Sequence, residues 1–457
     1  MQLKRPSSAR LMLIVVGALL QLGPRGAASA QGNAAMELTL PQAIDLALKQ
    51  NPSLKLAQLA VVDSEQKKKI ARADYFPQIK NESTAFHVTE IQQLVIPEGA
   101  LGVDPTIGPI PGKTAVIGQG TFTAYTSGTG LSQPLTQMFK VHEDNRAATA
   151  DINSATIHVK QAENDIALKV RQLYYGILIA QLKETAAKNE AEAAQLKLQE
   201  TTSSVEQGSA LEVVALESHA ALLDAKQTIL MQNLRVRDLT FQLNYLLGLP
   251  LNTQLKLNEE LSAASVSISP REECVRIARE QSPEIRAAQQ AVEKAKAGLA
   301  ASKDAYIPDV SAFARYSYQS GIPFLVHNFG TFGVIFTYEL FDGGRRNAQI
   351  DESRTMLSQA EVSLAKAKEE VTVQVEIAYD KVEQMQNFIA VAEEVLKTRA
   401  EAALVADRKF EQNAALASAR AEAAAKTSSA KASLLEANLG LSLAQGELRR
   451  AMGEIPR

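Results

Sequence analysis

Apolar residues recur through residues 345–411 in alternating steps of four and three positions. The repeating positions are Val371, Val375, Ala378, Val382, Met385, Ile389, Ala392 and Leu396. This spacing is a heptad seam, which predicts a helix that packs lengthwise against other helices. No Pro or Gly interrupts the segment, and Ala, Glu, Gln and Lys fill its other faces. At 1.5 Å per residue the helix spans on the order of 100 Å, which is longer than one compact domain requires.

The same seam occurs 205 positions upstream and predicts a second long helix over residues 140–206. Its repeating positions are Ile166, Val170, Leu173, Ile177 and Ala180, and Tyr174 corresponds to Tyr379. Self-similarity at a fixed offset indicates an internal duplication.

Each long helix is preceded by an interrupted helix and followed by a shorter one. Thr39 suits the N-cap of the first helix, which Asn51-Pro52 interrupts, and Ser282-Pro283 repeats this break. After the long helices, turns containing Gly208 and Asn413 lead into helices over 211–247 and 416–452; both residue types tolerate the left-handed conformation. Two of the shorter helices placed end to end are about as long as one long helix. The long helices and the pairs of shorter helices are therefore expected to line one cylinder.

Between these helices, each half shifts towards strand-like alternation, which predicts β-hairpins over 76–134 and 307–341. The strands of the second hairpin are expected over 309–318 and 331–341, and the Pro- and Gly-rich residues 91–120 are expected to form a long loop. A single occurrence would fit a soluble hairpin inserted between helices. Two occurrences, with aromatic residues near strand ends, are typical of membrane strands. Because four strands cannot enclose a water-filled lumen, several chains are expected to share one barrel.

The N-terminal segment has the pattern of a secretory signal peptide over residues 1–30. Lys4, Arg5 and Arg10 precede the short apolar stretch Leu11–Leu20, and Ala28-Ser29-Ala30 offers a cleavage site. No later stretch approaches eighteen uninterrupted apolar residues, so the sequence predicts no membrane-spanning helix. Only strands would then cross a membrane.

Charge and reactive side chains exclude several functions. The chain has 48 basic and 51 acidic residues, and removal of the basic leader makes it more acidic, which argues against nucleic-acid partners. The single Cys274 excludes an intrachain disulfide and is interpreted as a small apolar core residue. The five histidines lack the spacing of metal ligands, and no phosphate-binding Gly loop or nucleophile elbow occurs. No enzyme activity, cofactor or metal is expected.

The order of these motifs, repeated in both halves, resembles the TolC-like family of outer-membrane efflux and secretion channels (outer membrane factors). The motifs are Leu38–Leu48 with Asn51-Pro52, Tyr75-Phe76-Pro77, Gln133-Pro134-Leu135 and Glu339-Leu340-Phe341-Asp342-Gly343-Gly344. The resemblance implies a mainly α fold with membrane β, internally duplicated, in which residues 31–250 and 270–457 are outer-membrane efflux repeats joined by a connector over 251–269. In a homotrimer, four strands per chain would form a twelve-stranded outer-membrane β-barrel continued by a long periplasmic α-helical barrel.

The resemblance further implies a passive exit duct of a tripartite efflux or type I secretion system in a Gram-negative-type outer membrane, extending into the periplasm. Its partners would be outer-membrane lipid, a periplasmic membrane-fusion (adaptor) protein and an inner-membrane transporter of RND, ABC or MFS type, which supplies the energy. A passive duct has little substrate specificity, so drug, metal, small-molecule and protein export remain open. The heptads alone would also permit a periplasmic coiled-coil scaffold or adaptor without a pore, whereas the paired hairpins favour the channel.

In this family the adaptor docks at the helical tips, which map onto the two predicted turns. These comprise Val205, Glu206, Gln207, Gly208, Ser209, Ala210 and Leu211 in the first half, and Phe410, Glu411, Gln412, Asn413, Ala414, Ala415 and Leu416 in the second. Acidic side chains inside the tip gate the pore in known members and match Glu217 and Glu422 here. The alternative is that both are solvated glutamates on a helix face. The family's basic gate partner maps to Ala415, so Arg408 or Arg420 would have to replace it.

Overall fold

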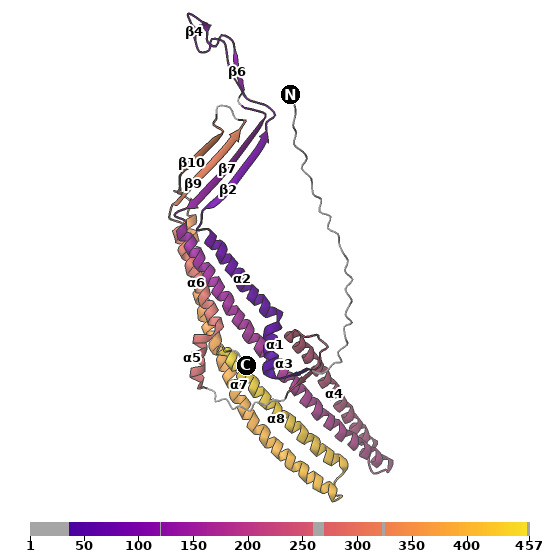
Figure 1. The fold of residues 1–457 in the computed structure, drawn as a ribbon. Helices are drawn as coiled ribbons and strands as arrows, with labels where there is room; N and C mark the ends of the chain where they lie inside the picture. The colour runs from indigo at the N-terminus through magenta and orange to yellow at the C-terminus, as the bar shows by residue number, and fades with distance from the viewer. Residues whose placement is uncertain (1–35, 119, 259–268, 322–324, 455–457) are drawn as a thin grey trace, which may run out of the picture.

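The computed structural model describes residues 36–118, 120–258, 269–321 and 325–454, so the predicted signal peptide over 1–30 lies outside the described residues. The molecule is an elongated rod with a β-sheet at one end and two helical hairpins at the other (Figure 1). None of the helices in these ranges combines the length and apolar character that crossing a lipid bilayer requires.

The helices of the two halves follow one order. The first half contains α1 (Leu40–Gln50), α2 (Pro52–Ala73), α3 (Met138–Glu206) and α4 (Glu212–Leu247). The second half contains α5 (Arg271–Gln281), α6 (Pro283–Asp304), α7 (Arg345–Glu411) and α8 (Ala417–Ala451). The bounds of α3, α4, α7 and α8 lie within two residues of those expected from the sequence pattern. Thr39 forms a reciprocal capping box with Gln42 at the start of α1, and the Asn51 side chain accepts hydrogen bonds from the first backbone amides of α2.

One long helix forms the axis of each half, α3 in the first and α7 in the second. Helices α1, α2 and α4 pack along α3, while α5, α6 and α8 pack along α7; α3 also contacts α6 and α8, which joins the halves. The heptad positions face these contacts: Val170 and Val375 are fully buried, and Val371 and Val382 nearly so. Burying each such side chain stabilises the fold by about 1.5–3 kcal/mol. The predicted seams are therefore confirmed.

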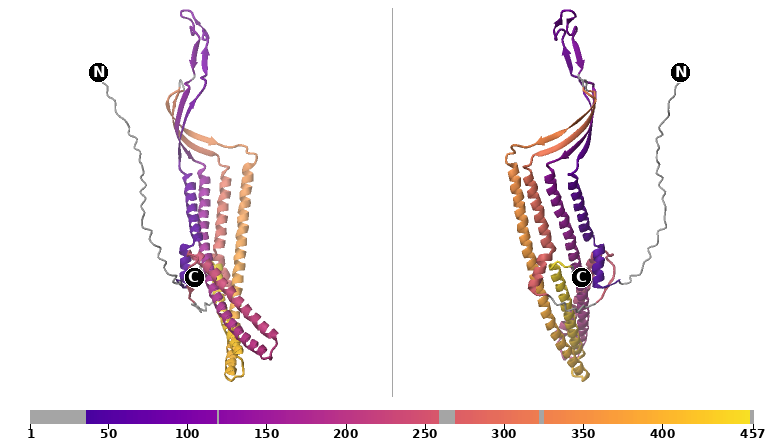
Figure 2. Two further views of the ribbon diagram at one scale, coloured as in Figure 1. Left: turned by 90° about the vertical axis from the view of Figure 1, so that its right-hand side faces the viewer. Right: turned by 60° about the vertical axis from the view of Figure 1, so that its left-hand side comes forward.

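Four strands form one antiparallel sheet of order β10-β9-β7-β2. Their bounds are β2 (Gln78–His87), β7 (Thr123–Pro134), β9 (Asp309–Ser320) and β10 (Asn328–Thr337). The central pair β7–β9 joins the two halves, and β2 and β10 are the outer strands. Figure 2 shows how the sheet curves away from the helical rod.

The structure corrects two expectations about the hairpins. The last strand ends at Thr337 rather than at Phe341, because Thr337 pairs with Asp309, the first residue of β9, and the following residues have no strand opposite them. The segment 91–120 is not a plain loop. It carries β3 (Gln93–Ile96) paired with β6 (Ala115–Gly118), and β4 (Val103–Asp104) paired with β5 (Gly108–Pro109). These short pairs form a protrusion beyond the sheet (Figure 2).

The connector between the halves contains a pairing that the sequence pattern did not indicate. Strand β8 (Leu255–Leu257) runs parallel to β1 (Met36–Leu38). The buried Tyr174 hydroxyl donates towards the carbonyls of Leu38, at 3.0 Å, and Asn258, at 2.9 Å. The connector is thereby tied to the core around α3.

Candidate functional site

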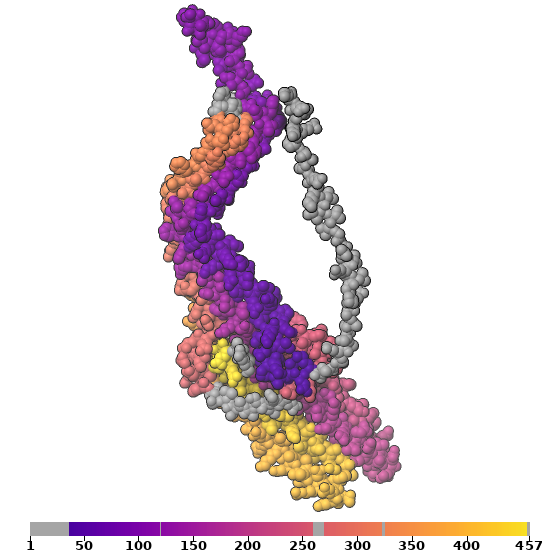
Figure 3. All heavy atoms as spheres, in the orientation of Figure 1, coloured from indigo at the N-terminus to yellow at the C-terminus, as the bar shows by residue number. Residues whose placement is uncertain are grey.

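The turns α3–α4 and α7–α8 lie at the end of the rod opposite the sheet, where the two hairpins separate into two tips (Figures 1 and 3). Both turns have one hydrogen-bond pattern. Gly208 N donates to Val205 O at 2.9 Å and Ser209 N donates to Ser204 O at 2.9 Å. In the other tip, Asn413 N donates to Phe410 O at 3.0 Å, and Ala414 N donates to Lys409 O. This pair of bonds defines the Schellman motif, which satisfies carbonyls at a helix C-terminus.

The central residue of each turn is left-handed, as the sequence predicted. Gly208 has a φ of 70° and Asn413 a φ of 53°; Asn413 is the only non-glycine residue with positive φ among the residues that the structure describes. The L-configuration disfavours this conformation, and Asn tolerates it better than most residues. The two tips thus share one backbone shape despite different residues.

The tips expose both apolar and polar side chains around these turns. Leu211 and Leu416, which follow the turns, are 73% and 64% exposed. Gln207 and Gln412 are exposed at equivalent positions, whereas Phe410 is half-buried. Two unpartnered leucines beside polar groups suit a protein contact.

Arg420 contacts its own hairpin. Its Nε lies 2.6 Å from an Asp407 carboxylate oxygen, and its guanidinium lies 5.2 Å from the centre of the Phe410 ring. Arg420 is therefore held by α7 through an ion pair and a cation–π contact. In the single chain it is not placed as the basic partner of a gate glutamate.

The two candidate gate residues lie on different hairpins and in different surroundings. Glu217, on α4, is exposed. Glu422, on α8, forms an ion pair of 2.6 Å with Lys426 one turn later. This pairing lowers the pKa of the Glu422 carboxyl below its ordinary value, first through the Lys426 hydrogen bond and then through the charges of Lys426 and Lys197, while burial opposes the shift. Lys426 thus partly offsets the negative charge of Glu422, so the surroundings of Glu422 differ from those of the exposed Glu217.

Sequence reasoning missed the polar contacts that join the two hairpins near the tips. The Glu200 carboxylate of α3 accepts hydrogen bonds from the backbone N–H of Ser418, at 2.9 Å, and from its hydroxyl. Further along, Lys183 pairs with Glu436 at 2.8 Å. No spacing rule identifies such partners, because they are more than 200 positions apart. Ser418 also lines a cleft of about 250 Å³ between the two hairpins. The other lining residues include Lys197, Glu422 and Lys426.

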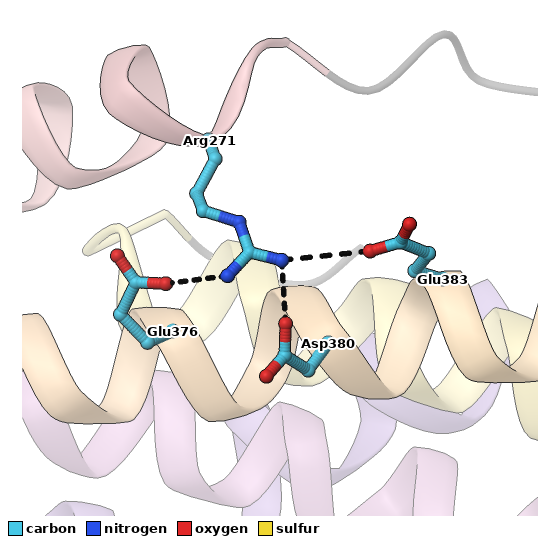
Figure 4. Close-up of polar contacts among 4 residues, drawn as sticks. All are labelled: Arg271, Glu376, Asp380 and Glu383. Atoms are coloured by element: carbon cyan, nitrogen blue, oxygen red, sulfur yellow. Dashed lines mark hydrogen bonds and ion pairs between the residues drawn. The ribbon is translucent and has the colours of Figure 1, made fainter.

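A second polar cluster attaches α5 to α7 midway along the rod. Arg271 contacts Glu376 at 2.8 Å, Asp380 at 2.5 Å and Glu383 at 3.4 Å (Figure 4), and its guanidinium lies 4.8 Å from the Tyr379 ring centre. These bonds raise the pKa of Arg271, with Asp380 contributing most. Three carboxylates around one cation leave the cluster acidic. Among the described residues, no group of His, Cys, Asp and Glu side chains is arranged to hold a metal ion.

One family model matches both halves of the chain. The model of the outer membrane efflux protein family matches residues 43–249 and 274–454. A search among curated proteins found no match. Several solved structures share the fold over most of their length, at low sequence identity.

Three of these solved structures show the extent of the similarity. The Campylobacter jejuni CmeC outer membrane channel is 16% identical, with a TM-score of 0.72 and coverage of 91% of this chain and 85% of that chain. The Vibrio cholerae outer membrane protein VceC is 15% identical, with a TM-score of 0.70 and coverage of 92% and 97%. The open state of the Neisseria gonorrhoeae MtrE outer membrane channel is 18% identical, with a TM-score of 0.69 and coverage of 92% and 89%.

The fold is thus the mainly helical, TolC-like one of these channels, a family of ducts and not of enzymes. With its family match on both halves, the chain belongs to the outer membrane efflux protein family.

Proposed function

We propose that this protein is the passive outer-membrane exit duct of a tripartite efflux or type I secretion system. Cargo would move through the duct across the periplasm and the outer membrane, and an inner-membrane transporter would supply the energy. The family match on both halves supports an efflux role. The chain has a sheet at one end for the membrane and helices long enough, at roughly 100 Å, to reach across the periplasm.

The observation that carries this proposal is the pair of matching tips. A duct that ends in the periplasm needs a docking surface at its free end. Here two hairpins present the same Schellman turn, with Gly208 and Asn413 in the left-handed position, at the end opposite the sheet. A repeated surface suits an adaptor that binds the same way at several sites around a ring.

The assembly follows from the same arrangement. The sheet has only four strands, so three chains would be needed for the twelve-stranded barrel, surrounded by outer-membrane lipid. A periplasmic adaptor would bind residues 205–211 and 410–416. An inner-membrane transporter of RND, ABC or MFS type would bind that adaptor. The proposed division is a signal peptide over 1–30, two efflux repeats over 31–250 and 270–457, and a connector over 251–269.

Glu217 and Glu422 are the proposed gate. Three copies of each would give six carboxylates near the narrow end, which would favour cations over anions. The ion pair with Lys426 weakens the contribution of the three Glu422 carboxylates. The three Glu217 carboxylates would therefore supply more of the negative potential.

Site-specific photo-crosslinking from Gln207 and Gln412 in intact cells tests the proposed docking. We expect capture of a periplasmic adaptor from both positions, identified by mass spectrometry. Lys140, at the opposite end of α3, is the matched control and is expected to capture no adaptor. Crosslinks only between copies of this chain would refute docking at the tips.

A scaffold or adaptor without a pore is the competing function. Ion conductance of the purified protein in planar bilayers separates the two, because only a duct conducts. Fractionation with the outer membrane together with stable single-channel steps supports the duct. A protein that stays in the soluble periplasmic fraction and never conducts would support the scaffold.

A further inference from the structure

The charged side chains of the four-stranded sheet all lie on one of its two faces. The Lys, Arg, Asp and Glu residues of β2, β7, β9 and β10 are Lys80, Glu82, Asp309 and Arg315. Lys80 and Arg315 both pair with Gly130. Glu82 and Asp309 lie an even number of residues from them on the same strands. Because successive side chains of a strand point to opposite faces, all four share one face.

The opposite face of the sheet carries none of these charges, and it is apolar beside the charged row. The four residues that pair across the strands at this level are Ile79, Leu131, Ala314 and Phe332. Ile79 and Phe332 are 69% and 88% exposed. A membrane strand turns its apolar face to lipid and its polar face to the lumen. In the proposed duct, Lys80, Glu82 and Arg315 therefore face the passage.

The Arg315 side chain lies flat across the neighbouring strand β7. A Cβ built on Gly128 would come within 2.5 Å of Arg315 Nε and 2.6 Å of its Nη2, so glycine leaves the room that the guanidinium occupies. On the far strand β2, a Glu82 carboxylate oxygen lies 3.8 Å from Nη2, and both side chains remain exposed. Arg315 thus reaches from β9 across β7 and presents its guanidinium on the surface of the charged face.

Gly130 leaves an open place between two basic side chains. A Cβ built on Gly130 would meet no atom within 4 Å. Lys80 and Arg315 flank it on β2 and β9, whose backbones are about 10 Å apart at twice the strand spacing. The guanidinium lies over Gly128, about 7 Å further along β7. An anion above Gly130 would therefore lie between the Lys80 ammonium and the Arg315 guanidinium.

We infer that Lys80 and Arg315 bind anionic groups of the cargo above Gly130, inside the part of the duct that the sheet lines. The ligand class is carboxylates, phosphates and sulfonates. The planar guanidinium donates to two oxygens of such a group, and the lysine ammonium adds a compact positive charge. Glu82 opposes this binding, because its carboxylate competes for the same guanidinium. The inference rests on the proposed duct and assigns it a class of cargo.

Block of single-channel current by a sulfated cyclodextrin tests this site, with the unsulfated ring as the neutral probe. Either ring is added to the full-length protein in planar bilayers, on the side of the sheet, at about 0.01 M salt, where charges act over about 30 Å. We expect the sulfated ring to block at a lower concentration than the neutral ring. Arg315→Gln and Lys80→Gln are each expected to weaken the block by the sulfated ring about tenfold, as loss of one charged hydrogen-bonding group gives.

Glu82→Gln separates anion binding from a purely structural role of Arg315. If Arg315 binds cargo anions, loss of the competing carboxylate is expected to strengthen the block by the sulfated ring. If Arg315 only ties β9 to β2, Glu82→Gln and Arg315→Gln would weaken that block alike, which would overturn the inference. The neutral ring is expected to block all variants equally.

Lys113→Gln is the matched control, because it removes one exposed positive charge from the protrusion and leaves the charged row intact. We expect it to leave the block by the sulfated ring unchanged. A loss as large as that in Lys80→Gln would show an effect of overall charge and would overturn the site.

Cysteine labelling checks the assignment of the two faces without measuring current. In a Cys274→Ala background, Thr331→Cys lies in the row of Arg315, and Phe332→Cys lies on the opposite face. In liposomes, a charged maleimide is expected to label Thr331→Cys at least about tenfold faster, because hydrocarbon excludes the charged reagent. Faster labelling of Phe332→Cys would overturn the assignment.

The outcomes also separate this inference from the function on which it rests. An unmodified protein that inserts into bilayers and never conducts would overturn the duct and, with it, the anion site. A conducting protein in which Arg315→Gln and Lys80→Gln leave the block by the sulfated ring unchanged would overturn only the anion site.

Discussion

The Glu200 carboxylate on α3 accepts a 2.9 Å hydrogen bond from the backbone N–H of Ser418, in the first turn of α8. It also accepts a hydrogen bond from the Ser418 hydroxyl. Leu416, the N-cap residue of α8, makes no side-chain cap, so a carboxylate from the other hairpin takes that role. One residue therefore caps a helix and joins the two tips.

Replacing Glu200 by Ala is expected to loosen the start of α8. Loss of a cap costs about 1 kcal/mol, so amide exchange in the first turn of α8 is expected to rise about fivefold. Hydrogen–deuterium exchange with mass spectrometry measures this. Glu206→Ala, an exposed glutamate on the same helix, is the control and is expected to leave that turn unchanged. Equal protection in the Glu200 variant would contradict the assigned cap.

Substitutions at the two left-handed positions are expected to differ in their effects. Gly208→Ala places a Cβ at a φ of 70° and is expected to destabilise the first tip by about 1 kcal/mol. Asn413→Gly relieves a φ of 53° and is expected to protect the second tip or leave it unchanged. Amide exchange at the two turns provides the comparison. Faster exchange in Asn413→Gly than in Asn413→Ala would refute the explanation.

Removing the Arg271 guanidinium is expected to weaken the attachment of α5 to α7. Arg271→Ala leaves Glu376, Asp380 and Glu383 close together without their cation. Because these side chains are partly exposed, we expect only a small loss of stability at low salt and pH 7. The loss is expected to shrink in 1 M salt, which screens the repulsion among the three carboxylates.

Thermal unfolding of the Arg271→Ala protein at low salt and in 1 M salt measures this effect. Arg276→Ala is the matched control, since Arg276 pairs with Glu273 and Glu280 on its own helix α5. It is expected to cost less stability than Arg271→Ala, because both of its partners lie on the same helix. A loss in Arg271→Ala that is the same in 1 M salt would indicate a packing effect rather than charge repulsion.

The two proposed gate glutamates are expected to contribute unequally. Glu217→Gln is expected to lower the cation selectivity of single channels more than Glu422→Gln does, because Lys426 already offsets Glu422. Reversal potentials in a salt gradient measure selectivity. Replacing both by Ala is expected to raise resting conductance, and unchanged conductance with unchanged selectivity would remove the gate role.

The ion pair of Glu422 also has a defined pH dependence. Its pKa in the folded chain is lowered, so the pair adds stability above the ordinary glutamate pKa of about 4.3 and loses it as pH falls through the folded value. We expect Glu422→Gln to lower the free energy of unfolding by no more than about 0.5 kcal/mol at pH 7, and by less at pH 3.

The single thiol is expected to react slowly in the folded protein. Cys274 is fully buried, and burial followed by the charge of Glu273 raises its pKa. We expect labelling by a maleimide at pH 7.5 roughly 100-fold slower than in denaturant, as an opening free energy of about 3 kcal/mol gives. A Gln412→Cys variant in a Cys274→Ala background provides the fast-reacting control.

The raised pKa of Cys274 fixes the sign of a second effect. The folded state holds the thiol proton more tightly, so stability is full below the ordinary thiol pKa of about 8.5 and declines as pH rises above it. Cys274→Ala is expected to show a shallower decline between pH 8 and 10. Identical slopes would refute a contribution from this thiol.

Local patterns sufficed for the helices and the tips because their determinants lie close together in the chain. The seam from Val371 to Val382 repeats at helical spacing, and the Gly208 and Asn413 turns depend on backbone preferences of single residues. Strand ends were less predictable. Strand β10 stops at Thr337 because its neighbour β9 begins at Asp309. The residues around Thr337 carry no information about where the paired strand begins.

The sequence by itself therefore determined the duplication, the order of helices, the left-handed turns and the family. Only the tertiary structure decided which side chains meet across the halves: Glu200 with Ser418, and Arg271 with Glu376, Asp380 and Glu383. The reason is physical. Helical periodicity reports which face of a helix is apolar, whereas an ion pair or a cap between distant segments depends on the relative placement of two packed helices, which no local spacing encodes.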